Sequence, residues 1–203
     1  MKKRKSTVER KSKETDIVAN LSIDGEGKAK INTQIGILDH MIELFAFHGF
    51  FDLQINVKKA DTNVDIHHTN EDVGIVLGKT FKDALGDKIG IRRFGAAMAC
   101  MEATVARVVI DISGRGFFKF NKEQKVFSDP GVQDGYALSY LDHFLESFAH
   151  ALDATMNLKI ENVSNDLHTN LEAVFKALGM ALDQATQIDP RRKGIPSTKG
   201  IID

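Results

Sequence analysis

The spacing of apolar residues along the chain predicts four helices and several strands. Apolar side chains three or four positions apart, which is the helical spacing, recur in four segments. These segments are residues 38–46, 68–85, 136–152 and 167–185. Alternation of apolar and polar residues, which is typical of a half-buried strand, marks a second set of segments. This set comprises residues 52–57 and 155–160, a hairpin expected over 16–33 around Asp24-Gly25, and a strand pair expected from 104–113 and 116–121.

Two motifs occur twice and in the same order. LDHMIELFA at 38–46 and LDHFLESFA at 141–149 are identical at six of nine positions. DIHHTNEDVGIVLG at 65–78 and DLHTNLEAVFKALG at 166–179 share the leading Asp, a His two residues later, a Glu four residues after that His, and the closing Leu-Gly. Self-similarity of this kind indicates an internal duplication.

The duplication and the predicted elements together define the expected fold class. The chain divides into a first half (residues 1–95), a second half (residues 96–190) and a C-terminal tail (residues 191–203). Each half is expected to run β-β-α-β-α, which is an α+β arrangement with helices packed on one face of a sheet. The opposite faces of the helices become buried if the two halves pack together.

Composition narrows the class of protein. Lys and Arg number 27 against 28 Asp and Glu, a balance that argues against a nucleic-acid partner. No apolar run approaches the ~20 residues that a membrane span needs. A single cysteine excludes a disulfide framework and a cysteine-based zinc finger and suggests a reducing compartment, so we expect a cytoplasmic protein. Seven basic residues fall within residues 1–13, which we interpret as a solvated chain end without a function.

Histidines and glutamates in the second repeated motif predict a metal site. His67 and Glu71 are four residues apart and therefore share a face of a helix. His168 and Glu172 repeat this pair in the second half. His68 points about 100° away from its neighbour, toward a different site. Imidazole and carboxylate donors suit first-row metals such as Mn²⁺, Fe²⁺ or Zn²⁺.

The first repeated motif adds two further candidate ligands. His40 and His143 occupy matching places on the helices that precede the His-x-x-x-Glu pairs. Core packing alone gives no reason for such a set to recur, so the recurrence favours metal binding. The two remaining histidines, His48 and His150, fall outside the repeat, and we interpret them as structural. At a helix end, a cationic His48 would also interact favourably with the helix dipole.

Basic residues beside turns predict a binding site for a phosphate group. Bidentate Arg groups, Lys and Ser/Thr hydroxyls are the donors that a phosphate monoester needs. The candidates are Arg92 and Arg93 in GIRRFG, Arg115 in DISGRG, Lys176 four residues after Glu172, and Ser197, Thr198 and Lys199 in IPSTKG. Neither glycine-rich nucleotide-binding motif occurs in the sequence, so nucleotide binding has no support.

The motifs LDHM, DIHHTNEDVGIVLG, IGIRRFG, DISGR, EAVFKAL and IPSTKG follow one another along the chain. With them the sequence resembles the imidazoleglycerol-phosphate dehydratase family of histidine biosynthesis, from about residue 8 to residue 201. The resemblance implies a duplicated α+β fold and assembly as a 24-subunit shell of trimers. It also implies active sites between subunits that hold two Mn²⁺ ions through histidines and glutamates.

The resemblance assigns roles to individual residues. The implied metal ligands are His40, His67, His68, Glu71, His143, His168 and Glu172. The implied phosphate-binding residues are Arg93, Arg115, Lys176, Ser197 and Lys199. Glu14 matches a further active-site acid of the family, so Glu14 and Glu172 are the candidates for the general base.

The chain departs from the family pattern at one imidazole of the second motif. The family has His-His-x-x-Glu there, and this chain has Leu-His-Thr-Asn-Leu-Glu. Pairing His168 with His67 makes Thr169 the replacement and keeps the His-x-x-x-Glu face, whereas a shift by one residue makes Leu167 the replacement. Under the first alignment, which we prefer, the lost imidazole belongs to the metal held by His67 and Glu71.

Two further differences from the family pattern are Asn157, in place of a histidine, and Glu102-Ala103, in place of an acidic pair. The reaction that the resemblance implies is dehydration of D-erythro-imidazole-glycerol phosphate to imidazole-acetol phosphate. The differences leave open a non-catalytic or impaired metal-binding paralogue. A metal-dependent phosphatase using the same acids and phosphate site is a second alternative, which the absence of carboxylate-rich two-metal motifs disfavours.

Overall fold

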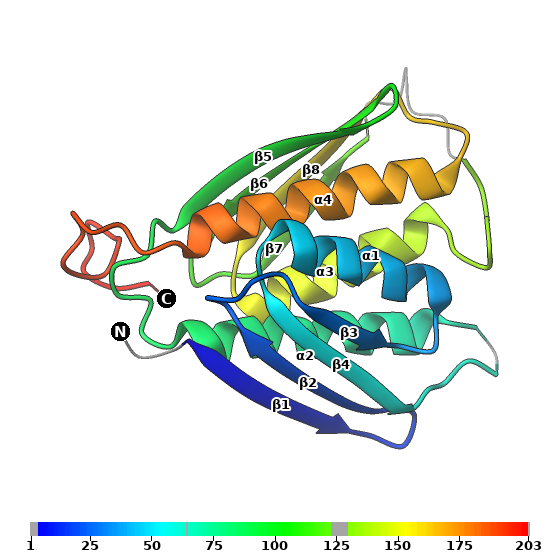
Figure 1. Ribbon diagram of the computed structural model, residues 1–203, viewed down its shortest axis with the longest axis horizontal. Coiled ribbons are helices and arrows are strands. Elements are labelled where there is room, and N and C mark those ends of the chain that lie inside the picture. Colours follow the sequence, from blue (N-terminus) through cyan, green and yellow to red (C-terminus); the bar gives the residue numbers. More distant parts are fainter. Residues whose placement is uncertain (1–3, 64, 123–129, 203) are drawn as a thin grey trace.

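The structure is a computed structural model that describes residues 4–63, 65–122 and 130–202. Each half contributes a four-stranded sheet and two helices (Figure 1). The first half runs β1 (Lys5–Lys11), β2 (Asp16–Ser22), β3 (Ala29–Asn32), α1 (Gly36–His48), β4 (Asp52–Lys59) and α2 (His67–Leu85). The second half runs β5 (Phe94–Met101), β6 (Thr104–Asp111), β7 (Phe117–Asn121), α3 (Leu138–Leu152), β8 (Thr155–Glu161) and α4 (Leu167–Thr186). The α+β fold with an internal duplication is confirmed, with one more strand in each half than predicted.

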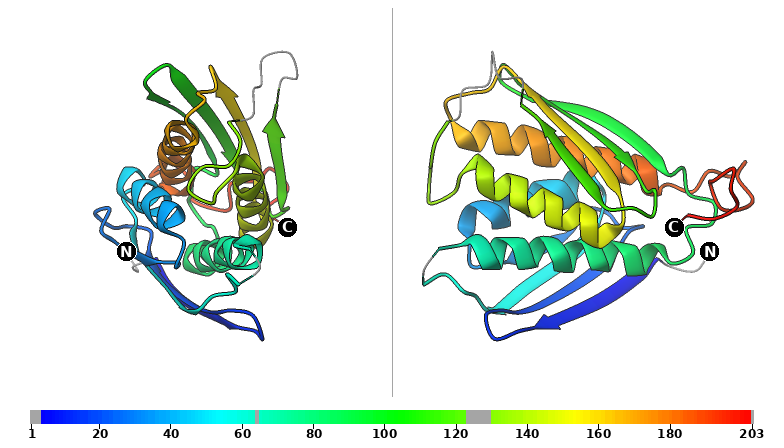
Figure 2. Two further views of the ribbon diagram at one scale, coloured as in Figure 1. Left: turned by 90° about the vertical axis from the view of Figure 1, so that its right-hand side faces the viewer. Right: turned by 180° about the vertical axis from the view of Figure 1, so that it is seen from behind.

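The helices occupy the middle of the molecule, between the two sheets (Figure 2). In the first half α2 packs on β1 and β2 and α1 on β3, and in the second half α4 packs on β5 and β6 and α3 on β7. The helices of the two halves also pack on each other, α2 against α3 and α1 against α4. Each helix is therefore covered on two sides, and the prediction that the halves bury their helices against one another is confirmed. None of the helices in the described parts of the chain is long and apolar enough to cross a membrane.

The pairing of strands differs from the prediction in both sheets. The orders are β1-β2-β4-β3 and β5-β6-β8-β7. The hairpin predicted around Asp24-Gly25 is wrong, because β2 pairs antiparallel with one side of β4 and β3 pairs parallel with the other. The Asp52 carboxylate at the start of β4 accepts the backbone N–H groups of Glu26 (2.8 Å) and Lys28 (3.2 Å), which holds the connection across the end of the sheet. The predicted pair of 104–113 with 116–121 is wrong for the same topological reason, since β6 and β7 flank β8.

The prediction of a solvated N-terminal segment is wrong for residues 5–11, which form β1 and pair along their whole length with β2. Exposed positions alternate with core-facing positions along β1, so Lys5 and Lys11 are exposed while Val8 packs against the core. On that inward side Arg10 pairs with Asp72 of α2. The many charged residues of this segment obscured the alternation of exposed and core-facing positions that is typical of a strand. Residues 1–3 lie outside the described part of the chain.

The closing Leu-Gly of each repeat lets the helices of the two halves approach closely. A Cβ on Gly78 of α2 would lie 2.5 Å from the carbonyl oxygen of Phe148 in α3. A Cβ on Gly179 of α4 would lie 2.4 Å from the carbonyl oxygen of Phe45 in α1. Phe45 and Phe148 are themselves repeat-related. The same motif thus sets both helix–helix contacts, and all four helices begin at one end of the molecule (Figure 1).

Candidate metal and substrate site

The histidines of the repeated motifs gather at the end of the molecule where the helices begin. His67 is the first residue of α2 and His168 the second of α4, while His40 and His143 lie in the second turns of α1 and α3. Because α1 packs against α4 and α2 against α3, each histidine of the first motif meets the His-x-x-x-Glu pair of the other half. The result is two donor groups, each built from both halves of the chain.

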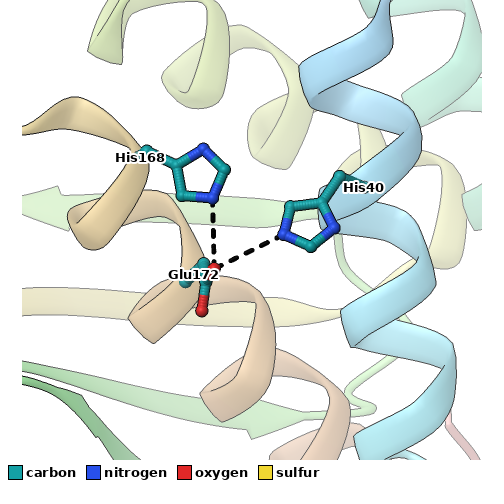
Figure 3. Close-up of side chains that lie close together, drawn as sticks. All are labelled: His40, His168 and Glu172. Carbon is teal, nitrogen blue, oxygen red and sulfur yellow. Dashed lines mark hydrogen bonds and ion pairs between the residues drawn. The ribbon is translucent and has the colours of Figure 1, made fainter.

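The α1–α4 donor group consists of His40, His168 and Glu172 (Figure 3). The Nε2 atoms of His40 and His168 lie 3.4 and 3.1 Å from the same oxygen, Oε1 of Glu172. One ligand atom from each of the three residues falls within 4.8 Å of the others. The two rings stack with centroids 5.2 Å apart. Two imidazoles and one carboxylate converging in this way form a donor set suited to a first-row divalent metal.

Glu172 is held as a carboxylate. It is 13% exposed, and its second oxygen pairs with Nζ of Lys176 one turn along α4. Burial raises its pKa, but the hydrogen bonds from Lys176 and His40 and the positive charge of Lys176 outweigh burial, so the pKa lies below its usual value. A carboxyl group that stays ionised is a good metal ligand and a weak proton acceptor.

The α2–α3 donor group consists of His67, Glu71 and His143. His67 lies between the other two: its Nδ1 is 3.1 Å from Nδ1 of His143, and its Nε2 is 3.5 Å from Oε2 of Glu71. The donor types are those of the α1–α4 donor group, but the His67 ring presents a different nitrogen to each neighbour. A shared ion here would therefore need this ring to turn, whereas the α1–α4 donors already converge.

A third cluster consists of His68, Asp61 and Glu14, and the ring of His68 also contacts that of His67 edge-on, with centroids 5.7 Å apart. Nδ1 of His68 lies 2.9 Å from Oδ2 of Asp61 and 4.0 Å from Oε2 of Glu14. The hydrogen bond with Asp61 and the negative charge of Glu14 raise the pKa of His68. Asp61 was not predicted from the sequence, where its signal is a carboxylate in the short polar segment between a predicted strand and the His-His pair. Glu14 was predicted through the family resemblance.

The predicted phosphate-binding residues do not all come together within one chain, although Arg93 and the tail that carries Ser197 and Lys199 do. Arg93, in the left-handed region at φ 76°, gives both Nε and Nη2 to the Asp111 carboxylate (2.6 and 3.1 Å) and Nη1 to the carbonyl of Pro196 (3.0 Å). It therefore ties the tail carrying Ser197 and Lys199 to the end of β6. Asp111, which makes this contact possible, was also missed from the sequence.

The tail and the donor groups lie at opposite ends of the helices (Figure 1). The backbone of Arg93 contacts Ala185 near the end of α4, while His168 is at its start. A 20-residue helix is about 30 Å long. Of the predicted phosphate-binding residues, Lys176 alone contacts a donor group in the described structure, through Glu172. Arg115 lies in the turn after β6, where its backbone N–H bonds Oγ of Ser113.

Comparison with known proteins identifies the kind of chain to which this site belongs. The family model described as Imidazoleglycerol-phosphate dehydratase matches residues 33–182. A relative of that name from Methanocella arvoryzae is 47% identical over 199 residues, 98% of this chain and 100% of its own. Another, from Geobacillus kaustophilus, is 48% identical over 201 residues, 98% of this chain and 99% of its own. The crystal structure of IGPD from Pyrococcus furiosus matches with a TM-score of 0.79 at 33% identity, over 96% of this chain and 99% of that one.

The chain belongs to the imidazoleglycerol-phosphate dehydratase family. Membership confirms the resemblance drawn from the motifs and the expectation of an enzyme. It also identifies the duplicated fold, since the matched crystal structures from Pyrococcus furiosus and, at 30% identity and a TM-score of 0.77, Staphylococcus aureus are those of family members.

The starts of α2 and α4 show which residue of this family member replaces the second imidazole. The Asp65 carboxylate accepts the backbone N–H of His67 (2.6 Å), and the Asp166 carboxylate accepts that of His168 (3.1 Å). The two histidines are therefore structural counterparts, which favours the alignment that makes Thr169 the replacement. Thr169 is only 6% exposed, and its hydroxyl donates to the second oxygen of Asp166 (3.1 Å).

The two remaining histidines take no part in these groups. Burial and the nearby Lys176 lower the pKa of His48, so the structure does not support a cationic ring interacting with the dipole of α1. His150 lies on the last turn of α3, against Gly116. The structural role of His150 stays a prediction.

Proposed function

We propose that the chain dehydrates D-erythro-imidazole-glycerol phosphate to imidazole-acetol phosphate in histidine biosynthesis, using two divalent metal ions, with Mn²⁺ as the expected metal. The observation that carries the proposal is the crossed arrangement of two His-His-Glu donor groups at one end of the helices. Family membership supplies the substrate class, and the donor types suit the metal.

The residues present fit the proposed ions. His40, His168 and Glu172 would hold one ion and His67, Glu71 and His143 the other, with His68 as a further donor. When bound, the ions supply Lewis-acid polarisation of the nitrogens of the substrate's imidazole ring and a template for its orientation. The low pKa of Glu172 keeps this donor ionised at neutral pH.

The proton removed from C2 of the substrate needs a base, and we assign that role to Glu14. Glu172 is a poor candidate, because Lys176 and two imidazoles stabilise its charged form and reduce its proton affinity. In the described part of the chain the Glu14 carboxylate makes one such contact, with Nδ1 of His68 at 4.0 Å. The Glu14 carboxylate would accept the C2 proton, and the C2–H electron pair would form a double bond to the neighbouring carbon that carries the imidazole ring. The hydroxyl on that carbon would leave and take up the proton from Glu14 to become water, and the resulting enol then becomes the ketone.

Arg93, Arg115, Lys176, Ser197 and Lys199 are proposed to bind the substrate phosphate. Holding the phosphate fixes the direction of the C2–H bond relative to the base, which is a positioning contribution to the rate. Because the tail of one chain lies about 30 Å from its own donor groups, a small substrate would require the tail of one subunit beside the donor groups of another. This separation supports sites between subunits, and the family resemblance implies that the subunits assemble as a 24-subunit shell of trimers.

A pair of variants tests the assignment of the two glutamates. Purified protein is assayed with Mn²⁺ and the substrate, by formation of the enolisable ketone and, separately, of inorganic phosphate. Glu14→Gln should lose at least about a hundredfold in kcat and keep its metal. Glu172→Gln should lose metal. Glu26→Gln is the matched control, because Glu26 is exposed and, among the residues that the structure describes, its carboxylate pairs with Lys28.

The outcomes separate the proposal from its alternatives. Full activity of Glu14→Gln with bound metal would contradict its role as the base. Metal binding without ketone formation by the wild type would indicate a non-catalytic paralogue. Release of inorganic phosphate in place of the ketone would indicate a phosphatase.

A further inference from the structure

The side chains of the cluster around His68 have no ionisable counterparts in the second half of the chain, although the corresponding backbone hydrogen bonds are present there. The backbone N–H of Asp61 donates to Oγ1 of Thr69 (2.9 Å), and the backbone N–H of Ser164 donates to Oδ1 of Asn170 (2.9 Å). Thr69 and Asn170 each lie two residues after the first histidine of their motif. Ser164 is therefore the structural counterpart of Asp61.

The other two members of the cluster have also changed. Glu14 precedes the buried Thr15 at the turn from β1 to β2, and Ala103 precedes the buried Thr104 at the turn from β5 to β6. Ala103 is thus the counterpart of Glu14, as Thr169 is the counterpart of the second histidine. Where the first half has a glutamate, an aspartate and a histidine, the second half has alanine, serine and threonine.

Conservation within the chain follows a pattern. Each half of the chain contributes two histidines and one glutamate to the two donor groups. The cluster around His68 differs, because none of its three ionisable groups has an ionisable counterpart in the second half. The hydrogen bond between Asp61 and His68 indicates that these two residues work as a unit.

The hydrogen bond between Asp61 and His68 indicates the role of this pair. His68 donates its Nδ1–H to the Asp61 carboxylate at 2.9 Å, which leaves Nε2 as the free acceptor nitrogen of the neutral ring. The His68 side chain is 52% exposed, so this nitrogen is accessible from outside the subunit. A carboxylate that holds the second ring nitrogen of a ligand histidine fixes its orientation and raises its basicity.

We infer that Asp61 is a positioning residue that presents Nε2 of His68 as a metal ligand, and that this unit serves only one of the two ions. The inference rests on the proposed function and deepens it. A neighbouring copy of this chain is the recipient, because His68 converges with Glu14 and Asp61 rather than with a donor group of its own subunit, and its side chain is 52% exposed. The ion that receives His68 gains a third imidazole as its fourth protein ligand. The other ion has Thr169 in the corresponding place, so the two ions bind with unequal affinity.

Titration of the metal-free protein with Mn²⁺, with free ion measured by electron paramagnetic resonance, tests this directly. The wild type should bind one ion per subunit at least about tenfold more tightly than the second. Asp61→Asn should weaken the tight class about ten- to a hundredfold, the usual effect of removing such a partner, and leave the weak class unchanged. The backbone hydrogen bond of Asp61 survives this change, and Glu26→Gln serves as the surface control.

The reverse variant adds the unit to the second half. Ser164→Asp combined with Thr169→His should tighten the weak class by about tenfold or more. Two equal classes in the wild type, or an Asp61→Asn titration that superposes on the wild type, would overturn the inference alone. Absence of any bound Mn²⁺ in the wild type would contradict the proposed function as well. A circular-dichroism melt of each variant confirms that the change acts on a folded protein.

Discussion

Replacing Gly179 by alanine tests the physical link between the repeated Leu-Gly and the site. The new Cβ would lie 2.4 Å from the carbonyl oxygen of Phe45 and 3.0 Å from the backbone nitrogen of Gly49. A carbon and a carbonyl oxygen in contact are about 3.3–3.6 Å apart, so α1 and α4 must separate by roughly 1 Å. Both neighbours are main-chain atoms, and no rotation of a side chain relieves the overlap.

The expected cost follows from two opposing effects. Overpacking a tight contact costs about 1–3 kcal/mol, while the change from glycine to alanine inside a helix returns about 1 kcal/mol. Because the backbone itself must move, we place the overpacking at the upper end, which leaves a net loss of about 2 kcal/mol in the free energy of unfolding. With an m-value of about 2 kcal/mol/M in urea, the unfolding midpoint falls by about 1 M.

The assay is urea unfolding followed by circular dichroism at one fixed protein concentration, since assembly would make stability depend on concentration. Gly36→Ala is the control, because Gly36 begins α1 and a Cβ there meets nothing within 4 Å. Its midpoint should equal or slightly exceed that of the wild type. If Gly179→Ala unfolds at the same urea concentration as Gly36→Ala, the close approach of the two helices is wrong.

Three further outcomes are expected. Arg93→Lys keeps the charge but loses the bidentate contact with Asp111, so it should raise KM and speed proteolysis of the tail while metal content stays constant. Asp24→Asn should lower the free energy of unfolding by at most about 1 kcal/mol at pH 7, since the pair with Arg4 is partly exposed. The hydrogen bond from Arg4 holds the Asp24 pKa below 3.8, so the wild-type advantage should persist above about pH 4 and disappear as the pH falls through the folded-state pKa; an advantage that grew in acid would contradict this sign. Chelation should lower Tm, and Mn²⁺ at about a hundred times its Kd should restore about 2.7 kcal/mol per site; an unchanged Tm would contradict metal binding.

The regular elements with strong local patterns could be predicted. The helical spacing located α2, α3 and α4 nearly to their ends, and alternation located β4 and β8. β5 had no predicted counterpart, because its core-facing positions include Gly95, where a Cβ would meet the carbonyl of Ala181 in α4. A close contact between a strand and a helix requires small residues, and small residues do not produce the apolar–polar alternation by which a strand is recognised in the sequence.

Within the site, the sequence identified the candidate metal ligands but not which of them share a donor group. The repeat singled out His40, His143 and the two His-x-x-x-Glu pairs, and spacing alone explains why Glu172 lies beside His168. That His40 joins the second half, and His143 the first, depends on which helices pack together. Asp61 and Asp111 escaped notice because an isolated carboxylate near a turn has no distinguishing local pattern.

The sequence by itself determined the duplication, the helices, the donor types and the family, because each of these depends on residues close together in the chain or on motifs in order. The tertiary structure alone decided strand partners, the crossing of His40 and His143 between halves, the Asp61–His68 contact and the separation of the tail from the donor groups. Those features arise where segments far apart in the sequence meet, and helical and strand periods describe only which face of an element is buried. What covers that face is decided by packing, here with Gly78 and Gly179 among the glycines that let the helices of one half reach those of the other.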